Sequence, residues 1–365
     1  MRGAIVHEWL EVLGGAENVV DRFAQLYPEA PIYTLWNDSG SRFPVSRVHG
    51  SWLANTKLRR HKSLALPLMP LVWRHLGAED LDWVLCSSHL FAHHARFSGA
   101  ARDATKFVYA YTPARYIWDP HSDPRGRALS ARVASPFLRP LDKKRAADAH
   151  SIVAISRFVA ERIEKTWERA TPVIYPPVNL ARFERLPALN EADELELAKV
   201  PESFILGASR FVRYKRLEDV IHAGSVVDSP VVIAGSGPDE DRLRAEASRS
   251  RVPVHFVLSP SHELLVHLYD RAAAFVFPAI EDFGIMPVEA MASGTPVIGL
   301  RRGGVAETVS DGISGVLIDN FGSTSELRAA FETVTALDES GVKARARVFD
   351  ESTFDRAIRD WLPHG

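Results

Sequence analysis

Two glutamates, Glu281 and Glu289, flank a loop and the start of a predicted helix. The apolar run 274–277 before them predicts a buried parallel strand. A strand, a loop and a helix in this order place backbone N–H groups at the carboxyl edge of a sheet, where they can bind anions or hydroxyl-rich ligands. We expect this role for three consecutive residues: Phe283, Gly284 and Ile285. The alternative is that the two glutamates are acidic residues that only favour a helix start.

Two cations, Arg210 and Lys215, follow an apolar run that begins at Phe204. They lie between the end of a predicted strand and the start of a predicted helix. At this position two positive side chains can neutralise a diphosphate. The alternative is ordinary surface charge, which is common in loops.

A glycine pair, Gly14 and Gly15, follows the first predicted strand. Glu17 comes next, and a helix is predicted from about 18 to 26. Glycines in such a turn let the backbone approach a phosphate. The pattern is not G-x-G-x-x-G, so a nicotinamide or flavin cofactor is not favoured. Glycine pairs also occur in tight turns without any ligand.

Another predicted strand, 106–110, leads directly to Tyr111, and Arg115 follows four residues later. The tyrosine hydroxyl can donate or accept a hydrogen bond, but with an ordinary pKa near 10 it is a poor base at neutral pH. A structural aromatic residue with a satisfied hydroxyl is the alternative interpretation of Tyr111. The Arg115 guanidinium could bind a carboxylate or phosphate of an acceptor through two hydrogen bonds.

The elements that must position these residues alternate between strand and helix, with glycine turns after the strands. This alternation predicts an α/β protein built from doubly wound parallel sheets. Paired prolines, Pro176 and Pro177, follow a predicted strand and predict a stiff crossing between domains. We therefore predict an N-terminal domain at 1–177, a second domain at 178–345 and a C-terminal helix at 346–365.

The composition predicts a globular protein and excludes several classes of function. The chain has 365 residues, 46% of them hydrophobic and 25% charged, so a packed core is expected. The net charge of −2 argues against general nucleic-acid binding. A single cysteine, Cys86, excludes an internal disulfide and a cysteine zinc site, which fits a reducing cytoplasm. We recognise neither a signal peptide nor a spanning segment in the sequence.

The segment 58–76 combines basic residues with an apolar, tryptophan-containing run. Cations beside an apolar face suit the interface of a membrane with anionic headgroups. The alternative is a pair of core-packed helices interrupted by Pro67 and Pro70. The sequence thus allows peripheral contact with the inner face of a membrane.

Three strings of this sequence resemble glycosyltransferase family four, whose members are retaining and use sugar nucleotides. They are the GGAE turn at 14–17, TP-x-RY-x-WD at 112–119 and EDFGI-x-PVEA at 281–290. The resemblance implies the GT-B fold, in which two Rossmann-like domains face each other across a cleft and C-terminal helices return to the first domain. One departure is clear: family members carry a histidine where this chain has Tyr111.

The resemblance also implies a role for each motif. Arg210 and Lys215 would stabilise the leaving diphosphate, Glu281 would hold hydroxyls of the donor sugar, and Glu289 would hold the ribose. Backbone groups of the loop at 283–285 and of the glycine pair would contact the donor. On the acceptor side we expect Glu17 and Arg115. Tyr111 takes the position of a histidine that lies near the reacting sugar in relatives, so the resemblance places it with Glu281, Arg210 and Lys215 among the catalytic residues.

The function implied by the resemblance is retaining transfer of a hexose, with mannose from GDP-mannose as the preferred donor. The acceptor would be a lipid-linked or glycan precursor, and neither a metal ion nor a further cofactor is expected. Two alternatives stay open. One is a UDP- or dTDP-hexose donor, and the other is a protein that binds a sugar nucleotide without turnover.

Overall fold

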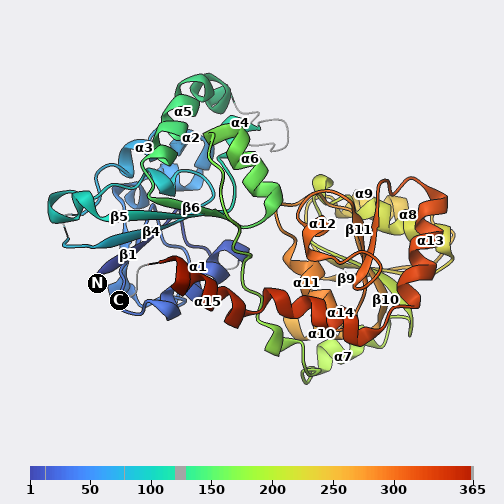
Figure 1. The fold of residues 1–365 in the computed structure, drawn as a ribbon. Coiled ribbons are helices and arrows are strands. Elements are labelled where there is room, and N and C mark those ends of the chain that lie inside the picture. Colours follow the sequence, from blue (N-terminus) through green and yellow to red (C-terminus); the bar gives the residue numbers. More distant parts are fainter. Residues whose placement is uncertain (13, 78, 120–128, 363–365) are drawn as a thin grey trace. The chain divides into compact units, whose positions relative to one another are not determined.

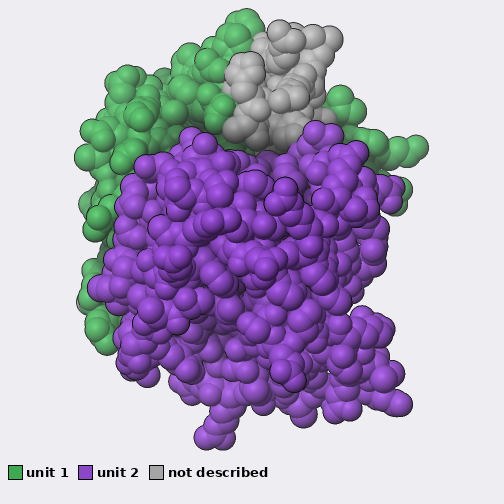
Figure 2. Space-filling model, turned by 90° about the vertical axis from the view of Figure 1, so that its right-hand side faces the viewer, with its two compact units in different colours: residues 1–177, 352–365 green, residues 178–351 purple. Residues whose placement is uncertain are grey.

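A computed structural model of the chain describes residues 1–12, 14–77, 79–119 and 129–362, and divides them between two compact units (Figures 1 and 2). Unit 1 contains residues 1–177 and 352–365, and unit 2 contains residues 178–351. The chain passes from unit 1 to unit 2 at Pro177, beside the paired prolines. It returns at Ser352, six residues later than the sequence prediction placed the second crossing. Within the described ranges, no helix is long and apolar enough to cross a membrane.

Unit 1 is built on a six-stranded parallel sheet in the order β3-β2-β1-β4-β5-β6. The strands are β1 (Gly3–His7), β2 (Ile32–Thr34), β3 (Val48–Gly50), β4 (Trp83–Ser88), β5 (Thr105–Ala110) and β6 (Ser151–Ala154). The helices are α1 (Gly15–Leu26), α2 (Lys62–Ala65), α3 (Met69–Val72), α4 (Arg115–Trp118), α5 (Leu129–Ala147), α6 (Arg157–Trp167) and α15 (Glu351–Trp361). The central strands β1 and β4 are buried along their whole length, as expected for a sheet covered on both faces.

Unit 2 repeats this architecture with the order β12-β11-β10-β7-β8-β9. Its strands are β7 (Phe204–Ala208), β8 (Val231–Gly235), β9 (Val254–Leu258), β10 (Ala272–Phe277), β11 (Val297–Leu300) and β12 (Gly315–Ile318). Its helices are α7 (Glu191–Leu197), α8 (Leu217–Val227), α9 (Glu240–Ala247), α10 (His262–Arg271), α11 (Ile285–Ala292), α12 (Val305–Thr308), α13 (Thr324–Thr335) and α14 (Glu339–Ala346). The core is formed by apolar residues of the central strands and of α8 and α13. The prediction of two Rossmann-like α/β domains is thereby confirmed, whereas the cleft between them stays a prediction.

The last helix, α15, belongs to unit 1, as the resemblance implied. Figure 1 shows α15, at the red end of the chain, beside α1, at the blue end. Phe354 lies on Phe23 of α1 with ring centroids 5.6 Å apart, and the Trp361 indole N–H donates to Ser151 Oγ at 2.7 Å. An ion pair between Arg22 and Asp355 joins the same two helices. The N-terminal and C-terminal parts of the chain therefore fold into one unit.

The segment 58–76 forms a short 3-10 helix followed by α2 and α3. Trp73 and Met69 are fully buried, so the tryptophan expected at a membrane interface instead belongs to the core of unit 1. Leu64 and Leu71 are the large apolar side chains of this segment that stay exposed. The interpretation as core-packed helices therefore holds for the tryptophan, and membrane contact stays a prediction.

Candidate functional site

The two sheets share one strand order, so each has a point where the chain changes direction across the sheet. In unit 1 this topological switch lies between β1 and β4, and in unit 2 it lies between β7 and β10. Ligands of open α/β sheets bind beyond the carboxyl ends of the strands at such a point. In both units, residues singled out from the sequence follow these strands.

In unit 2, an ion pair spans the switch point. Lys215 ends the short 3-10 helix η8 (Arg213–Lys215) after β7, and Glu281 follows β10. The Lys215 Nζ contacts Glu281 Oε1, and the two side chains are only 12% and 25% exposed. A cation and a carboxylate are therefore held together at the edge where a charged ligand would bind. The sequence prediction had assigned both residues to the donor but had not paired them with each other.

The loop after Glu281 is fixed by close backbone contacts. Gly284 has φ 88°, in the left-handed region that favours glycine, and immediately precedes α11. The Gly304 N–H donates to the Glu281 carbonyl at 2.8 Å, and a Cβ at Gly304 would lie within 2.3–2.5 Å of Phe283 backbone atoms. The helix begins at Ile285, and Pro287 is its third residue. The predicted group 283–285 thus forms the loop and the first residue of the helix.

Arg210 and Glu289 complete the predicted donor residues of unit 2. Arg210 is exposed, and its Nη2 donates to the Tyr214 hydroxyl at 3.1 Å. Glu289 lies on the second turn of α11 and is partly buried, and its Oε2 accepts a hydrogen bond of 3.2 Å from the Tyr269 hydroxyl. Burial raises the pKa of the Glu289 carboxyl, and the bond from Tyr269 opposes this rise. A ribose hydroxyl that bound Glu289 would therefore meet a carboxylate already oriented by Tyr269.

In unit 1, the glycine pair lies at the start of α1. Gly15 is the first residue of the helix, three residues earlier than the sequence indicated. The Glu17 carboxylate lies over Gly14, where a Cβ would come within 1.9 Å of Glu17 Oε2. Glu17 is 5% exposed, accepts a hydrogen bond of 3.2 Å from the Glu11 N–H, and has its pKa raised by burial. The Glu17 side chain, which was predicted to lie on the acceptor side, thus packs against the loop that precedes it.

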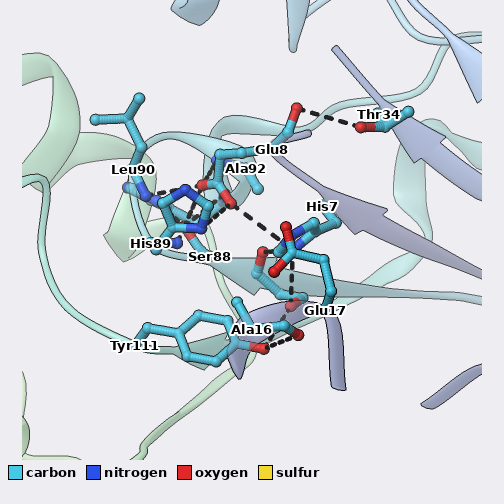
Figure 3. A network of polar contacts seen from close by, with 12 residues as sticks. His7, Glu8, Ala16, Glu17, Thr34, Ser88, His89, Leu90, Ala92 and Tyr111 are labelled. Atoms are coloured by element: carbon cyan, nitrogen blue, oxygen red, sulfur yellow. Dashed lines mark hydrogen bonds and ion pairs between the residues drawn. The ribbon is translucent and has the colours of Figure 1, made fainter. Parts of the chain in front are cut away.

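Tyr111 is held in a buried network of hydrogen bonds at the switch point of unit 1 (Figure 3). Its hydroxyl donates to the Ala16 carbonyl at 3.2 Å and lies 3.0 Å from Ser87 Oγ. His7 Nδ1 lies 3.1 Å from both the carbonyl and the hydroxyl oxygen of Ser87. Burial raises the pKa of Tyr111 well above its usual value and lowers that of His7 to about 4. Tyr111 therefore links β5 to the glycine-pair loop, and it is not a base at neutral pH.

The sequence analysis missed Glu8 and His89, which lie at the same switch point. Glu8 is fully buried, and its Oε1 accepts hydrogen bonds from the backbone N–H groups of His89, Leu90 and Ala92 at 3.1, 2.8 and 2.9 Å. Its Oε2 lies 3.2 Å from His89 Nδ1. The sequence did contain a signal for Glu8, because a charged residue directly after a strand that is buried along its whole length is unusual. Figure 3 shows how these residues converge.

Asp142 is a second buried carboxylate that the local sequence does not indicate. The run 142–145 consists of this aspartate and three cations, a pattern typical of a solvated face, but Asp142 is fully buried. Its Oδ1 lies 3.1 Å from His93 Nε2 and 3.0 Å from His94 Nε2. Its Oδ2 accepts indole N–H bonds of 2.7 Å from two tryptophans, Trp118 and Trp167. Burial raises the pKa of the Asp142 carboxyl, but His93 and His94 outweigh this effect and hold the pKa well below its usual value.

This arrangement also fixes the predicted string at 112–119. Arg115 begins α4, and Trp118 ends it. Because Trp118 is bonded to Asp142 of α5, the short helix is tied to the longer one. Arg115 therefore lies on an element whose position is determined by a buried charge.

Two groups of side chains within the described residues have the composition of a metal site. They are His7, Glu8 and His89, and His93, His94 and Asp142, with ligand atoms within 4.8 Å of one another. In the first group, His7 Nδ1 faces a carbonyl oxygen, to which it must donate a proton. In the second, both Asp142 oxygens are already hydrogen-bonded. The second group is therefore occupied by hydrogen bonds, whereas in the first group His7 Nε2 is buried and has no hydrogen-bond partner among the described residues.

The fold and the charged switch points define the class of protein. Two Rossmann-like units, one with a cation and a carboxylate beside a helix start, are the architecture of GT-B glycosyltransferases. The sequence matches "Glycosyltransferase Family 4" over residues 13–182 and "Glycosyl transferases group 1" over residues 191–348. Together the two matches cover both units and place the chain among the glycosyltransferases of these families.

Individual relatives are distant. A GDP-mannose-dependent alpha-(1-6)-phosphatidylinositol monomannoside mannosyltransferase of Mycolicibacterium smegmatis is 28% identical over 202 residues, which is 50% of this chain and 53% of that protein. The alpha-1,3/1,6-mannosyltransferase ALG2 of Rhizomucor pusillus is 24% identical and is matched over 86% of this chain and 80% of its own length. This chain thus spans about half of the first relative.

Solved structures support the fold. The crystal structure of Anabaena Alr3699/HepE in complex with UDP superposes with a TM-score of 0.71 and covers 99% of both chains, at 18% sequence identity. At this identity the likeness shows the fold alone.

Proposed function

We propose that this glycosyltransferase transfers a hexose from a nucleoside diphosphate sugar with retention of configuration. GDP-mannose is the first candidate donor, and a lipid-linked or glycan precursor is the acceptor. The observation that carries the proposal is the Lys215–Glu281 pair at the unit 2 switch point, beside the start of α11. The mannosyltransferase relatives support the choice of mannose, and UDP- or dTDP-hexoses are the rival donors.

The chemical difficulty of the reaction is the charge on the leaving diphosphate. Lys215, paired with Glu281, supplies positive charge next to the loop that carries Gly284, and backbone N–H groups at the start of α11 add to it. Arg210, which follows β7, would supply a second positive charge. One such contact typically stabilises a transition state by about 3 kcal/mol. Because side-chain cations neutralise the diphosphate, the proposed reaction requires no metal ion.

The two glutamates of unit 2 would bind hydroxyl groups in this proposal. Glu281, already oriented by Lys215, would accept hydrogen bonds from the sugar ring. Glu289, oriented by Tyr269, would accept them from the ribose. Neither is proposed as a covalent nucleophile, because attack on the same face of the sugar as the leaving group explains retention.

Unit 1 would contribute contacts to both substrates. Gly14 and Gly15 would offer backbone groups at the start of α1 to the donor, and Arg115 would offer a cation at the start of α4 to the acceptor. Tyr111 would act by holding the loop through Ala16, since its burial rules out a role as base. Glu17 would also hold the glycine-pair loop, because its carboxylate packs against Gly14 and accepts a hydrogen bond from the Glu11 N–H.

Calorimetric titration of a donor panel tests the proposal. GDP, UDP, dTDP and their hexose conjugates are titrated into the wild-type protein and into Glu289→Ala. We expect GDP compounds to bind most tightly and to lose affinity in the variant. A preference for UDP or dTDP would exclude GDP-mannose as the donor but would keep a nucleoside diphosphate sugar as the class of donor. If no nucleotide binds, the assignment of Lys215, Arg210 and Glu289 to a donor site is wrong.

A further inference from the structure

A pocket of about 280 Å³ lies in unit 1, at the amino-terminal edge of its sheet. Lys106, the second residue of β5, and Val84, the second residue of β4, are register partners and both line it. The switch point with Ser88 and Tyr111 is at the carboxyl ends of the same two strands. The pocket is therefore separate from the proposed acceptor side.

The pocket is strongly basic. Five cationic side chains converge on it from five separate segments: Arg74, Arg96, Arg102, Lys106 and Arg145. Arg74 follows α3, Arg102 lies in a 3-10 helix at 99–103, and Arg145 is near the end of α5. The fold thus gathers charges that are up to 71 positions apart in the sequence.

Among the described residues that line the pocket, only one carries a carboxylate that can balance these cations, and it is Asp148. Asp148 lies 3.3 Å from Arg145 Nη1 and 3.8 Å from Arg74 Nη1. It is 40% exposed, so much of its charge faces water. Arg96, Arg102 and Lys106 have no carboxylate partner within the described part of the chain.

Converging like charges are costly when they are buried. Lys106 is largely enclosed, and its Nζ donates to the His93 carbonyl at 3.2 Å, which holds the ammonium in place. Burial lowers the pKa of Lys106. It also lowers the pKa of Arg74, and the charges of Arg145 and Arg96 add to that effect. A multivalent anion in the pocket would remove this repulsion.

We propose that the basic pocket binds a phosphorylated ligand through a phosphate or diphosphate group. Guanidinium groups bind phosphate oxygens through paired hydrogen bonds, and Lys106 adds a point charge at the enclosed end. A volume of about 280 Å³ accommodates a diphosphate but is small for a whole sugar nucleotide. The proposal is independent of the donor site in unit 2. The phosphate could belong to a soluble molecule or to a lipid headgroup.

The test uses inorganic pyrophosphate as the probe and three proteins: the wild type, the double variant Arg96→Gln/Arg145→Gln, and Lys144→Gln. Lys144 is exposed, neighbours Arg145 on α5 and does not line the pocket, so Lys144→Gln is a matched loss of one positive charge. We expect pyrophosphate affinity to fall by at least about tenfold in the double variant and by less than about twofold in Lys144→Gln.

Thermal unfolding separates binding from folding. Without ligand, the double variant should be as stable as the wild type or more stable, because it removes repulsion. Pyrophosphate should raise the Tm of the wild type and of Lys144→Gln by more than that of the double variant, in which only the proposed donor site of unit 2 can still bind it. Equal pyrophosphate affinity in all three proteins would overturn the proposal, and so would absence of binding to the wild type at low ionic strength.

A second arm distinguishes the source of the phosphate. Each protein is sedimented with phosphatidylcholine vesicles that either contain or lack phosphatidic acid. Binding that requires phosphatidic acid, is lost in the double variant and is displaced by pyrophosphate identifies a lipid headgroup. Binding of pyrophosphate without any binding to vesicles identifies a soluble phosphate. Vesicle binding that is equal in the double variant would exclude the pocket as the lipid site.

Discussion

Neutralising Glu281 and neutralising Lys215 should change nucleotide affinity in opposite directions. In the ligand-free protein the Lys215 ammonium is paired with the Glu281 carboxylate. A diphosphate must therefore compete with Glu281 for this cation. Glu281→Gln leaves Lys215 available and should tighten the binding of a bare nucleoside diphosphate, whereas Lys215→Met should weaken it.

The charges and the burial of the pair set the order of magnitude of the effect. Two unit charges 4 Å apart interact by about 4 kcal/mol at an effective dielectric constant of 20. The side chains are 12% and 25% exposed, so water screens part of this energy and about 1.4 kcal/mol is a reasonable net value. Glu281→Gln should thus tighten GDP binding by about tenfold. Lys215→Met should lower kcat/KM by about a hundredfold, because one charged contact to the leaving group is lost.

Calorimetry with GDP and with UDP measures the affinities, and release of nucleoside diphosphate measures turnover. Glu281→Gln should lose turnover despite its tighter binding, since the sugar hydroxyls lose their acceptor. Arg213→Met is the matched control, because Arg213 is a cation of the same 3-10 helix whose side chain is 81% exposed. The reasoning is refuted if Glu281→Gln and Lys215→Met weaken GDP binding equally.

Three further predictions concern the elements behind the site. Gly304→Ala places a Cβ against the Phe283 backbone and should weaken GDP binding at least about tenfold, as measured by calorimetry. Asp142→Asn disrupts a buried charge with four donors and should lower the free energy of unfolding by about 3–5 kcal/mol in urea titrations. His7 and His94 have their pKa lowered by burial from 6.5 to about 4. Between pH 6.5 and 4 these two histidines are protonated in the unfolded state but stay neutral in the native state. The free energy of unfolding should therefore decrease as the pH falls through this range, by about 3 kcal/mol for each histidine.

Each of these predictions has a control or a contrary outcome. Gly341→Ala on α14 meets only ordinary contacts at 3.6–3.7 Å and should leave GDP binding unchanged. Asp103→Asn, at an exposed carboxylate of unit 1, should change the free energy of unfolding by less than about 0.5 kcal/mol. The loss of stability between pH 6.5 and 5 should be shallower in His94→Gln. An unchanged slope in that variant would contradict the buried-histidine account.

The fold could be predicted because its signals are local. Short apolar runs alternate with helices, some of them through glycine turns such as those at 14–15, 235–237 and 303–304, and this order indicates doubly wound sheets. The same logic placed Arg210, Lys215 and Glu281 after strands of unit 2. Their pairing could not be predicted, because β7 and β10 become neighbours only through the strand order of the sheet.

The buried carboxylates could not be predicted for the same reason. Glu8 and His89 are 81 positions apart in the sequence, and they meet because β1 pairs with β4. Asp142 stands in a run with three cations, a local pattern typical of a solvated face. Its partners come from three other elements, so its burial is a tertiary property. Trp73 shows the converse, since a tryptophan beside basic residues suggested an interface but packs in the core.

The most direct test of the central claim is real-time proton NMR of GDP-mannose and UDP-glucose incubated with the protein and an acceptor preparation of lipid-linked glycan precursors. The account predicts that one donor is consumed, that its nucleoside diphosphate accumulates, and that the new glycosidic anomeric signal keeps the configuration of the donor. Lys215→Met should slow this reaction by about a hundredfold. Inversion of configuration, or equal turnover in Lys215→Met, would contradict the account.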